Sequence, residues 1–544
     1  MKRARFLNAF LFFISLIFFS YLFYIQCLRH NYYETKAKKQ HQKKMIVLGA
    51  RGNIYDRNGL PLATSERCYS IFCTPRYSPD KTRLINELTR LTHKGKREIR
   101  KLVKQNKFFW VARKVSNKKK EEFMEIEDPS IGFTNDLNRR YNMPEIFSNL
   151  IGRCGLDNRG IEGLELQLNE VLNGQSGFTI YQKCPTGELI PYANYPEKEP
   201  KPGRDVYLTI DLQLQATLYQ HLKQCLLKEE ARYAAGLIIN PRTGEILALV
   251  NVGAENDKRN HVICDEFEPG STFKVITLAY ALLHGFKETN IINTEGGKVT
   301  VRGHTIHDFR NYGIITLKQA IAHSSNVAMV KISQKFDREG FYLLMRDFGL
   351  GELTGIEFPG EVTGRIPDWR KLNDVEFATL SFGQGVAVNL LQLAFVYQAI
   401  ANNGVLNKPL LISSIKDHQR TVYRGRPLRI RRVIPQEYAR RITEILCDVV
   451  EEGSGTAAAV EGVRVAGKTG TAQKVVNGRY SRNAIITTFI GYFPAESPEY
   501  LIAIMFDEPK KGYWASTIAA PVFKDVAQSI YQIGGLHYAI KNTD

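Results

Sequence analysis

The residues with the clearest chemical potential are Ser271 and Lys274, which stand three positions apart at the start of an apolar run. The run predicts a helix over 271–285, closed by Gly285. A serine at a helix N-terminus lies beside unpaired backbone N–H groups that can bind an oxyanion. A lysine one turn later lies on the same face, and burial among apolar neighbours would lower its pKa and make it a base for the hydroxyl. The pair predicts a serine nucleophile with a lysine base.

The S-x-x-K spacing alone is not specific. It occurs three more times, in stretches that are polar or turn-like or that lack a following apolar helical pattern: Ser78/Lys81, Ser116/Lys119 and Ser413/Lys416. The helical context is what favours Ser271 as the nucleophile.

A second motif is Ser324-Ser325-Asn326. A hydroxyl at Ser324 could relay a proton between a nucleophile, its base and a leaving amine. The amide of Asn326 could hold a substrate peptide. Serine and asparagine are also common at helix N-caps, and S-x-N recurs at Ser481/Asn483, so this motif alone leaves both interpretations open.

The third motif is Lys468-Thr469-Gly470, followed by Thr471, on a predicted strand. The lysine offers a cation and the two threonines offer hydroxyls, which suits a C-terminal carboxylate. A glycine lets a substrate backbone approach and pair with the strand edge. An ordinary strand that contains a glycine is the alternative interpretation.

These motifs need elements that hold them in place. Residues 234–251 predict two apolar strands around a turn, 462–493 predict a hairpin that turns at Asn477-Gly478, and 499–509 predict a further strand. Strands at both ends with helices between them predict a mixed α/β (α+β) fold. In that fold one antiparallel sheet joins distant parts of the chain and is covered by helices.

The N-terminus predicts a membrane segment. Residues 6–28 contain no charged side chain and, as a helix, are long enough to cross a hydrocarbon core of about 30 Å. A cleaved signal peptide and a lipoprotein signal at Cys27 are the alternatives, and the length of the apolar run argues against the first. The flanking charges alone would place the C-terminal side inside, although long domains can translocate regardless of charge.

Composition limits the other possibilities. The formal net charge of +19 predicts an anionic partner. Part of this charge lies in the basic stretch 92–114, which we interpret as a solvated helical face rather than a nucleic-acid patch. Eight cysteines are too few for a disulfide scaffold and none is spaced C-x-x-C. Pairing of Cys68 with Cys73 stays open.

The segment 195–205 is rich in proline and glycine, so it cannot form a helix or a central strand. It predicts a boundary between a region at about 45–200 and a larger one at 206–535. The first region begins with a hairpin signal at 51–63, which turns at Asn58-Gly59.

Together the three motifs are far more specific than apart, because they occur in a fixed order on a helix, a helix start and a strand. In this combination the sequence resembles the class B penicillin-binding proteins of the division (septal) type, the group of penicillin-binding protein 3. The resemblance covers nearly the whole chain. Residues 51–59 and 151–177 look like blocks of the class B pedestal, and 380–404 and 491–524 look like the division-type transpeptidase rather than the elongation type.

The resemblance implies a peptidoglycan D,D-transpeptidase that cross-links stem peptides through an acyl-enzyme on Ser271 and is acylated by β-lactams. Lys274 would take the proton of the nucleophile, and Ser324 and Lys468 would pass it on. Substrate would be held by Asn326, Thr469, Gly470 and Thr471, with the N–H groups of Ser271 and Thr471 as the oxyanion hole. The chemistry needs neither a metal nor a cofactor.

The resemblance also implies the organisation of the chain. A short cytoplasmic tail (1–5) would precede a transmembrane anchor (6–28), an elongated class B pedestal (45–200) and a serine β-lactamase-like transpeptidase domain (206–535). The catalytic domain would lie on the extracytoplasmic side of the cytoplasmic membrane. Partners would be peptidoglycan stem peptides, β-lactams, a separate glycan polymerase and proteins of the division complex, with no nucleic acid.

Several alternatives remain at this stage. An elongation-type transpeptidase, a D,D-carboxypeptidase or a penicillin sensor would share the fold. A β-lactamase could use the E-x-x-L-N string at 165–169, although in that family the string follows the nucleophile. A metal at His304, His307 and Asp308 would need a further ligand, and packing in a loop or strand is the preferred interpretation.

Overall fold

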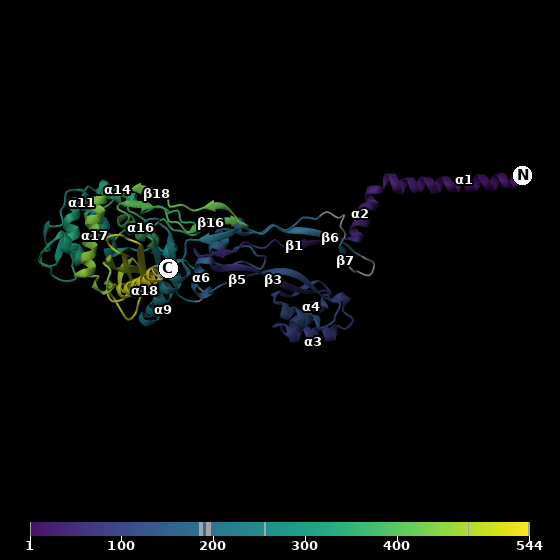
Figure 1. Ribbon diagram of the computed structural model, residues 1–544, viewed down its shortest axis with the longest axis horizontal. Coiled ribbons are helices and arrows are strands. Elements are labelled where there is room, and N and C mark those ends of the chain that lie inside the picture. The colour runs from purple at the N-terminus through teal and green to yellow at the C-terminus, as the bar shows by residue number, and fades with distance from the viewer. Residues whose placement is uncertain (1, 184–188, 192–196, 255–256, 477, 542–544) are drawn as a thin grey trace. The chain divides into compact units, whose positions relative to one another are not determined.

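The computed structural model describes residues 2–183, 189–191, 197–254, 257–476 and 478–541. Its chain passes back and forth between two compact units (Figure 1). The first unit comprises Met1–Arg51, Ser65–Asn138 and Asn173–Gly203, and the second comprises Gly52–Thr64, Arg139–Leu172 and Arg204–Asp544.

The first unit starts with the apolar helix that the sequence predicts. Helix α1 (Lys2–Phe23) continues through a π-helical turn (Tyr24–Leu28) into α2 (His30–His41). The 27 residues Lys2–Leu28 have a mean hydropathy of 2.2 in their most apolar window and bury no side chain, so this helix is long and apolar enough to cross a membrane. Strands β1 (Gln42–Val47), β6 (Gly177–Lys183) and β7 (Leu189–Pro191) follow as an antiparallel sheet.

The rest of the first unit is a small module in which helices pack on a sheet. Strand β3 (Pro61–Cys73) pairs with both of the other strands, and the core of the module lies between the sheet and the helices. The elements are β4 (Phe109–Val115), β5 (Ile131–Tyr141), α3 (Lys81–Leu91), α4 (Lys96–Lys104) and α5 (Asn117–Met124). The basic stretch is therefore helical only over α4, and continues as strand β4.

Both candidate cysteines of this module lie on β3 as free thiols. Five positions along one strand separate Cys68 from Cys73 by about 16 Å, far beyond the reach of a disulfide. The pairing that the sequence left open is therefore wrong.

The second unit begins with the predicted hairpin. Strand β2 (Ile54–Tyr55) returns through the Asn58-Gly59 turn into β3, and β2 also pairs in parallel with β8 (Asp205–Leu208). Beyond β8 lie β16 (Ile412–Asp417) and β17 (Arg420–Arg424). The second unit also contains α6 (Pro144–Ile151), α7 (Gly163–Gln167), α8 (Asn169–Leu172), β15 (Val405–Asn407) and β18 (Arg429–Arg432).

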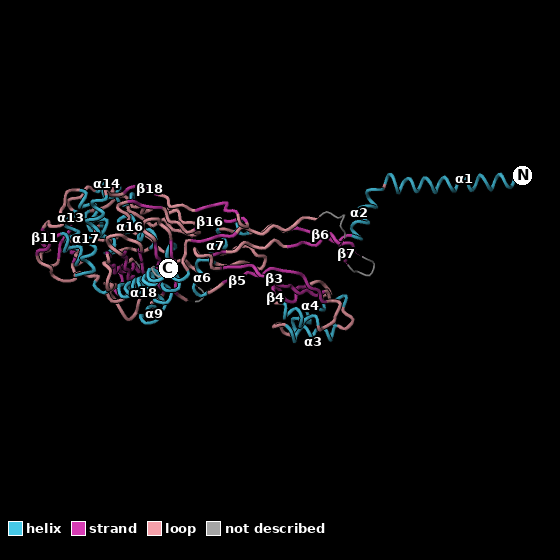
Figure 2. Tube along the Cα trace, viewed as in Figure 1, coloured by secondary structure: helices cyan, strands magenta, loops and turns pink. Residues whose placement is uncertain are grey.

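The centre of the second unit is a five-stranded antiparallel sheet with the order β10-β9-β21-β20-β19. Figure 2 distinguishes the strands of the chain (magenta) from its helices (cyan). Its strands come from two distant parts of the chain, as the sequence predicts. They are β9 (Tyr233–Ile239), β10 (Ile246–Val252), β19 (Ala466–Val476), β20 (Arg479–Phe493) and β21 (Tyr500–Asp507). The predicted turn at Asn477-Gly478 falls at residue 477, which lies outside the described residues.

Helices cover both faces of this sheet (Figure 1). The sheet separates two hydrophobic cores, and alternate residues of β9 pack into one or the other. Leu237 belongs to the larger core and Ile238 to the smaller. The smaller core lies under α9 (Leu212–Glu229) and α18 (Ala519–Lys541). The larger core lies under α11 (Lys274–Leu283), α16 (Leu390–Ala401) and α17 (Gln436–Glu451).

The segment between β10 and β19 supplies the remaining elements. Its helices are α10 (His261–Cys264), α12 (Leu317–Ala322), α13 (Asn326–Ser333), α14 (Arg338–Asp347) and α15 (Asp374–Leu380). Two short antiparallel pairs accompany them, β11 (Ile291–Asn293) with β14 (Ile314–Thr316) and β12 (Lys298–Val301) with β13 (His304–His307).

Candidate active site

Ser271 lies in a 3₁₀ turn (Gly270–Phe273) that leads directly into α11. The α-helix therefore begins at Lys274, three residues later than the sequence predicts, because tight turns are frequent at helix starts. The turn depends on Gly270, which has a φ of +55° and donates its N–H to the carbonyl of Gly383 at 3.1 Å. Ser271 is half-buried, whereas the next residues are fully buried.

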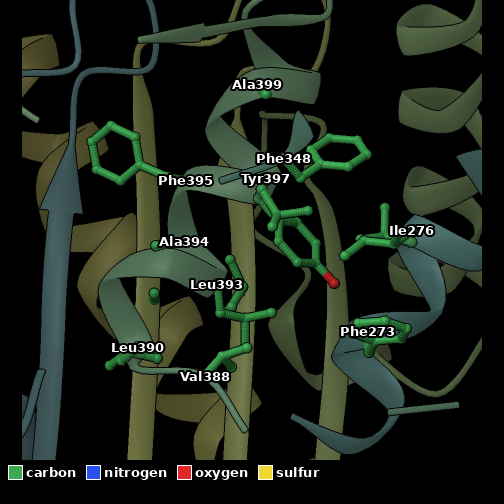
Figure 3. Close-up of a cluster of buried hydrophobic side chains, with 14 of the residues drawn as sticks. Phe273, Ile276, Phe348, Val388, Leu390, Leu393, Ala394, Phe395, Tyr397 and Ala399 are labelled. Carbon is green, nitrogen blue, oxygen red and sulfur yellow. The ribbon is translucent and has the colours of Figure 1, made fainter. Parts of the chain in front are cut away.

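The buried helix α16 packs beside this turn, with the Tyr397 side chain directed toward it (Figure 3). The hydroxyl of Tyr397 donates to the backbone carbonyl of Thr272 at 2.7 Å, and Phe273 and Ile276 lie in the same apolar cluster (Figure 3). Because a packed interior transmits displacement, the position of Ser271 depends on a helix more than a hundred residues away in sequence.

The amine of Lys274 is fully buried and has three acceptors. Its Nζ donates to the carbonyl of Ser324 at 2.6 Å, to the Ser324 hydroxyl at 3.1 Å and to Oδ1 of Asn326 at 2.7 Å. Burial, helped by the charge of Lys468, holds the pKa of Lys274 well below its ordinary value, and the carboxylate of Asp308 opposes this shift. Once it has lost a proton, this amine keeps two N–H donors for the three acceptors and has a lone pair that can accept a proton.

A second buried amine reaches the same hydroxyl. Nζ of Lys468, on β19, donates to Oγ of Ser324 at 3.0 Å and to the carbonyl of Thr469 at 3.3 Å. Burial lowers the pKa of Lys468 to about 7. The Ser324 hydroxyl thus lies between the two lysines, which is the position a proton relay needs.

Ser324 is held in an unusual conformation, with a φ of +63°. The next residue, Ser325, caps α13 by accepting the N–H of Ala328 at 3.0 Å. The helix-cap interpretation is therefore correct for Ser325, while Ser324 and Asn326 on either side face Lys274.

Asp308 fixes this loop, and sequence reasoning missed its place in the site. Its carboxylate accepts the Ser325 hydroxyl at 2.7 Å and the N–H groups of Asn326 at 2.6 Å and Val327 at 3.0 Å. The sequence offered Asp308 only as part of a metal pattern. The signal that could have found it is a carboxylate matched to a helix N-terminus, which is visible only once β13 and α13 are placed together.

Strand β19 is an edge of the five-stranded sheet, so its outer side is open to pairing. Its Thr469 is buried, with its hydroxyl 3.0 Å from that of Ser454. The hydroxyl of Thr471 accepts the N–H of Ala515 at 3.0 Å. Strand β19 also borders the turn that carries Ser271. A Cβ at Gly270 would lie only 3.2 Å from the Thr471 carbonyl oxygen.

Gly470 also has a structural reason inside the protein, besides the substrate approach that the sequence predicts. A Cβ there would lie 2.5 Å from Oγ1 of Thr488 and 2.8 Å from Cγ2 of Thr272. The missing side chain lets β19 pack against the nucleophile turn, so the glycine serves contact inside the protein.

A second carboxylate lies just upstream of Ser271. Glu268 accepts the N–H of Gly385 at 3.0 Å and the hydroxyl of Tyr480 at 3.2 Å, and burial raises its pKa. It connects the segment before Ser271 with the 383–385 loop and with strand β20. No motif marks this residue in the sequence.

The other S-x-x-K and S-x-N matches have ordinary structural roles. The Ser78 hydroxyl donates to Asp128 at 2.6 Å, and Ser116 caps α5. Ser413 lies on β16, and Ser481 accepts the N–H of Asn483 two residues along β20. None of these hydroxyls has a buried amine beside it among the described residues.

The E-x-x-L-N string is also structural. The Glu165 carboxylate is fully buried and accepts Nε of Arg139 at 2.6 Å, and Asn169 accepts the N–H of Gly160 at 2.9 Å. A carboxylate engaged in a buried ion pair is poorly placed to activate water.

Comparison with known proteins matches two domain families. Residues 234–528 match the penicillin-binding protein transpeptidase domain, and residues 46–208 match the penicillin-binding protein dimerisation domain. The probable peptidoglycan D,D-transpeptidase PenA of Neisseria meningitidis serogroup A is 32% identical over 531 residues, which cover 94% of this chain and 89% of that protein. The peptidoglycan D,D-transpeptidase FtsI of Buchnera aphidicola is 32% identical over 506 residues, covering 89% and 86%.

A solved structure leads to the same family. Penicillin-binding protein 3 of Mycobacterium tuberculosis, complexed with aztreonam, superposes with a TM-score of 0.71 at 26% identity, covering 90% of this chain and 97% of that one. Both the fold and the sequence similarity extend over nearly the whole chain. The chain therefore belongs to the class B penicillin-binding proteins, the family of serine-type peptidoglycan D,D-transpeptidases.

Proposed function

We propose that Ser271 is the nucleophile of a stem-peptide cross-linking reaction. Its hydroxyl attacks the penultimate D-alanine carbonyl while Lys274 takes the proton. Ser324 passes a proton to the nitrogen of the terminal D-alanine, which leaves, and an ester to Ser271 remains. An amine of a neighbouring stem peptide then attacks this ester, forms the cross-link and returns the hydroxyl. β-Lactams would acylate the same oxygen.

The observation that carries this proposal is the Ser324 hydroxyl, which lies 3.1 Å from Nζ of Lys274 and 3.0 Å from Nζ of Lys468. Two buried amines with lowered pKa values around one hydroxyl are costly to maintain, which supports a catalytic role for the cluster. The turn that carries Ser271 runs directly into Lys274, so the nucleophile lies next to this cluster.

The remaining site residues would bind the donor peptide. The open edge of β19 can pair with an extended peptide, and the Thr469 and Thr471 hydroxyls would hold its carboxylate beside Lys468. Asn326 would contact the peptide amide. The backbone N–H groups of Ser271 and Thr471 would form the oxyanion hole, a role that first-turn N–H groups can fill because they lack intrahelical partners. No step needs a metal or a cofactor.

We further propose that α1 anchors the protein in the cytoplasmic membrane, with residues 1–5 inside and everything after residue 28 outside. The substrate lies outside, and long domains can translocate against the local charge count. Residues 45–200 would act as the pedestal and 206–535 as the transpeptidase domain. Glycan polymerisation would come from a separate protein.

A septal role is the finer proposal. It is supported by the similarity to FtsI and by the division-type segments of the sequence, and it implies partners in the division complex. Depletion of the protein should then give filaments, whereas an elongation-type enzyme should give round cells on depletion.

The direct test is labelling of the full-length protein with fluorescent penicillin. Ser271→Ala should abolish the label, while Ser413→Ala, which removes a matched S-x-x-K serine, should leave it intact. Label that persists in Ser271→Ala would overturn the assignment. The lifetime of the acyl-enzyme separates the alternatives: slow release of hydrolysed drug is expected, and rapid release would favour hydrolysis over transpeptidation.

A further inference from the structure

A long, strongly basic segment of the chain lies outside the active site. Residues 92–120 contain twelve lysines and arginines and one acidic residue. Within this stretch, α4 places Arg97, Arg100, Lys101 and Lys104 on one face, because they follow the i, i+3, i+4, i+7 spacing of a helix. We call these four residues the basic face.

The basic face is exposed and has no internal counter-charge. The opposite side of α4 holds Ile99 and Val103 in the core of the module, so the four cations point away from that core. All four are exposed, and in the part of the chain that the structure describes no carboxylate forms an ion pair with any of them. Like charges at this spacing repel one another, so the face is arranged for an external anion.

The composition of the face indicates what kind of anion it binds. The exposed side chains of α4 include no apolar residue, because its apolar members Ile99 and Val103 are buried and Leu102 is half-buried. Protein interfaces need an apolar core, whereas a layer of phosphate headgroups is recognised by charge alone. The same compact unit contains α1, the helix long enough to cross a membrane. A tether of this kind keeps a weak binding surface near its ligand.

We propose that the basic face of α4 docks on the anionic phospholipid headgroups of the membrane in which α1 is anchored. The proposal rests on the proposed anchoring of α1 and not on the transpeptidase chemistry. Docking would hold the module at the lipid surface, and it would weaken as salt screens the charges.

The test is amine footprinting of the full-length protein in nanodiscs, with a water-soluble acylating reagent and mass spectrometry. Nanodiscs of phosphatidylcholine alone are compared with nanodiscs that also contain phosphatidylglycerol. Lys101 and Lys104 should react several-fold more slowly in the anionic discs and should recover at high salt. The exposed Lys524 on α18 serves as the internal control and should react equally in both.

Two variants make the result specific to the basic face. Arg97→Gln with Arg100→Gln leaves both reporter lysines in place, and it should weaken the protection about tenfold or more, since each basic residue near an anionic surface contributes substantially. Arg424→Gln with Arg426→Gln removes the same charge from exposed positions at and after β17 and should change nothing.

Equal reactivity of Lys101 and Lys104 in both lipids would overturn the proposal, and so would protection that survives Arg97→Gln with Arg100→Gln. Protection that appears only after an acidic protein is added would also overturn it, in favour of a protein partner. Penicillin labelling of the same samples reports on Ser271 separately, so a failure of lipid docking is distinguishable from a failure of the catalytic assignment.

Discussion

Lys468 should make folding less favourable at neutral pH than a neutral side chain of the same length would. Burial lowers its pKa to about 7, against an ordinary value of about 10.4. Between these values the unfolded chain holds a proton on Lys468 that the folded chain does not, so stability rises with pH. The shift corresponds to about 4 kcal/mol at pH 7, and to a slope of up to about 1.4 kcal/mol per pH unit above pH 8.

The comparison that isolates this effect is wild type against Lys468→Met in detergent, with thermal unfolding followed from pH 7 to 9.5. The wild type should gain stability relative to the variant as pH rises, by about 3 kcal/mol over this range. The variant should also lose penicillin labelling, because it would break the relay proposed through Ser324. Lys524→Met, at an exposed position, is the control. A stability difference between wild type and Lys468→Met that does not change with pH would refute the lowered pKa.

Three further outcomes are expected. Asp308→Asn weakens the three hydrogen bonds that fix the loop after Ser324, and should lower the penicillin acylation rate at least about tenfold with a stability loss of about 1–3 kcal/mol; an unchanged acylation rate would contradict the positioning role. Gly470→Ala places a Cβ 2.8 Å from Cγ2 of Thr272, so acylation should slow while global unfolding changes by about 1–3 kcal/mol. Glu165→Gln breaks the buried pair with Arg139 and should lower the free energy of unfolding by about 3–5 kcal/mol in a denaturant titration. It should leave the lifetime of the acyl-enzyme unchanged. Faster or slower deacylation would instead give this carboxylate a catalytic role.

Sequence reasoning located the elements that short-range patterns encode. The Asn58-Gly59 hairpin, the strands on either side of the 241–244 turn and the strand 499–509 all follow from local alternation and turn chemistry, and the structure has them. Strand patterns at both ends of the larger region, with helices between them, were enough to predict one antiparallel sheet covered by helices. The three motifs meet at Ser324 because β19 borders the turn before α11, while α13 borders α11 itself.

What the sequence did not reveal depends on contacts between distant residues. Tyr397 binds the carbonyl of Thr272 across 125 positions, and Asp308 reaches α13 across 17 or more, so no local pattern marks either residue. The internal contact at Gly470 was missed for the same reason, since only the packing of β19 against the turn shows what a side chain there would meet.

Helix α16 has a consequence for how drug sensitivity can evolve. All twelve of its residues are buried, and through Tyr397 it supports the backbone that presents the reactive oxygen. A change of one methylene group in this helix would shift that oxygen without altering any atom that a β-lactam touches. Resistance can therefore arise at positions that a map of inhibitor contacts would never include, and such changes would show up first as slower acylation with unchanged initial binding.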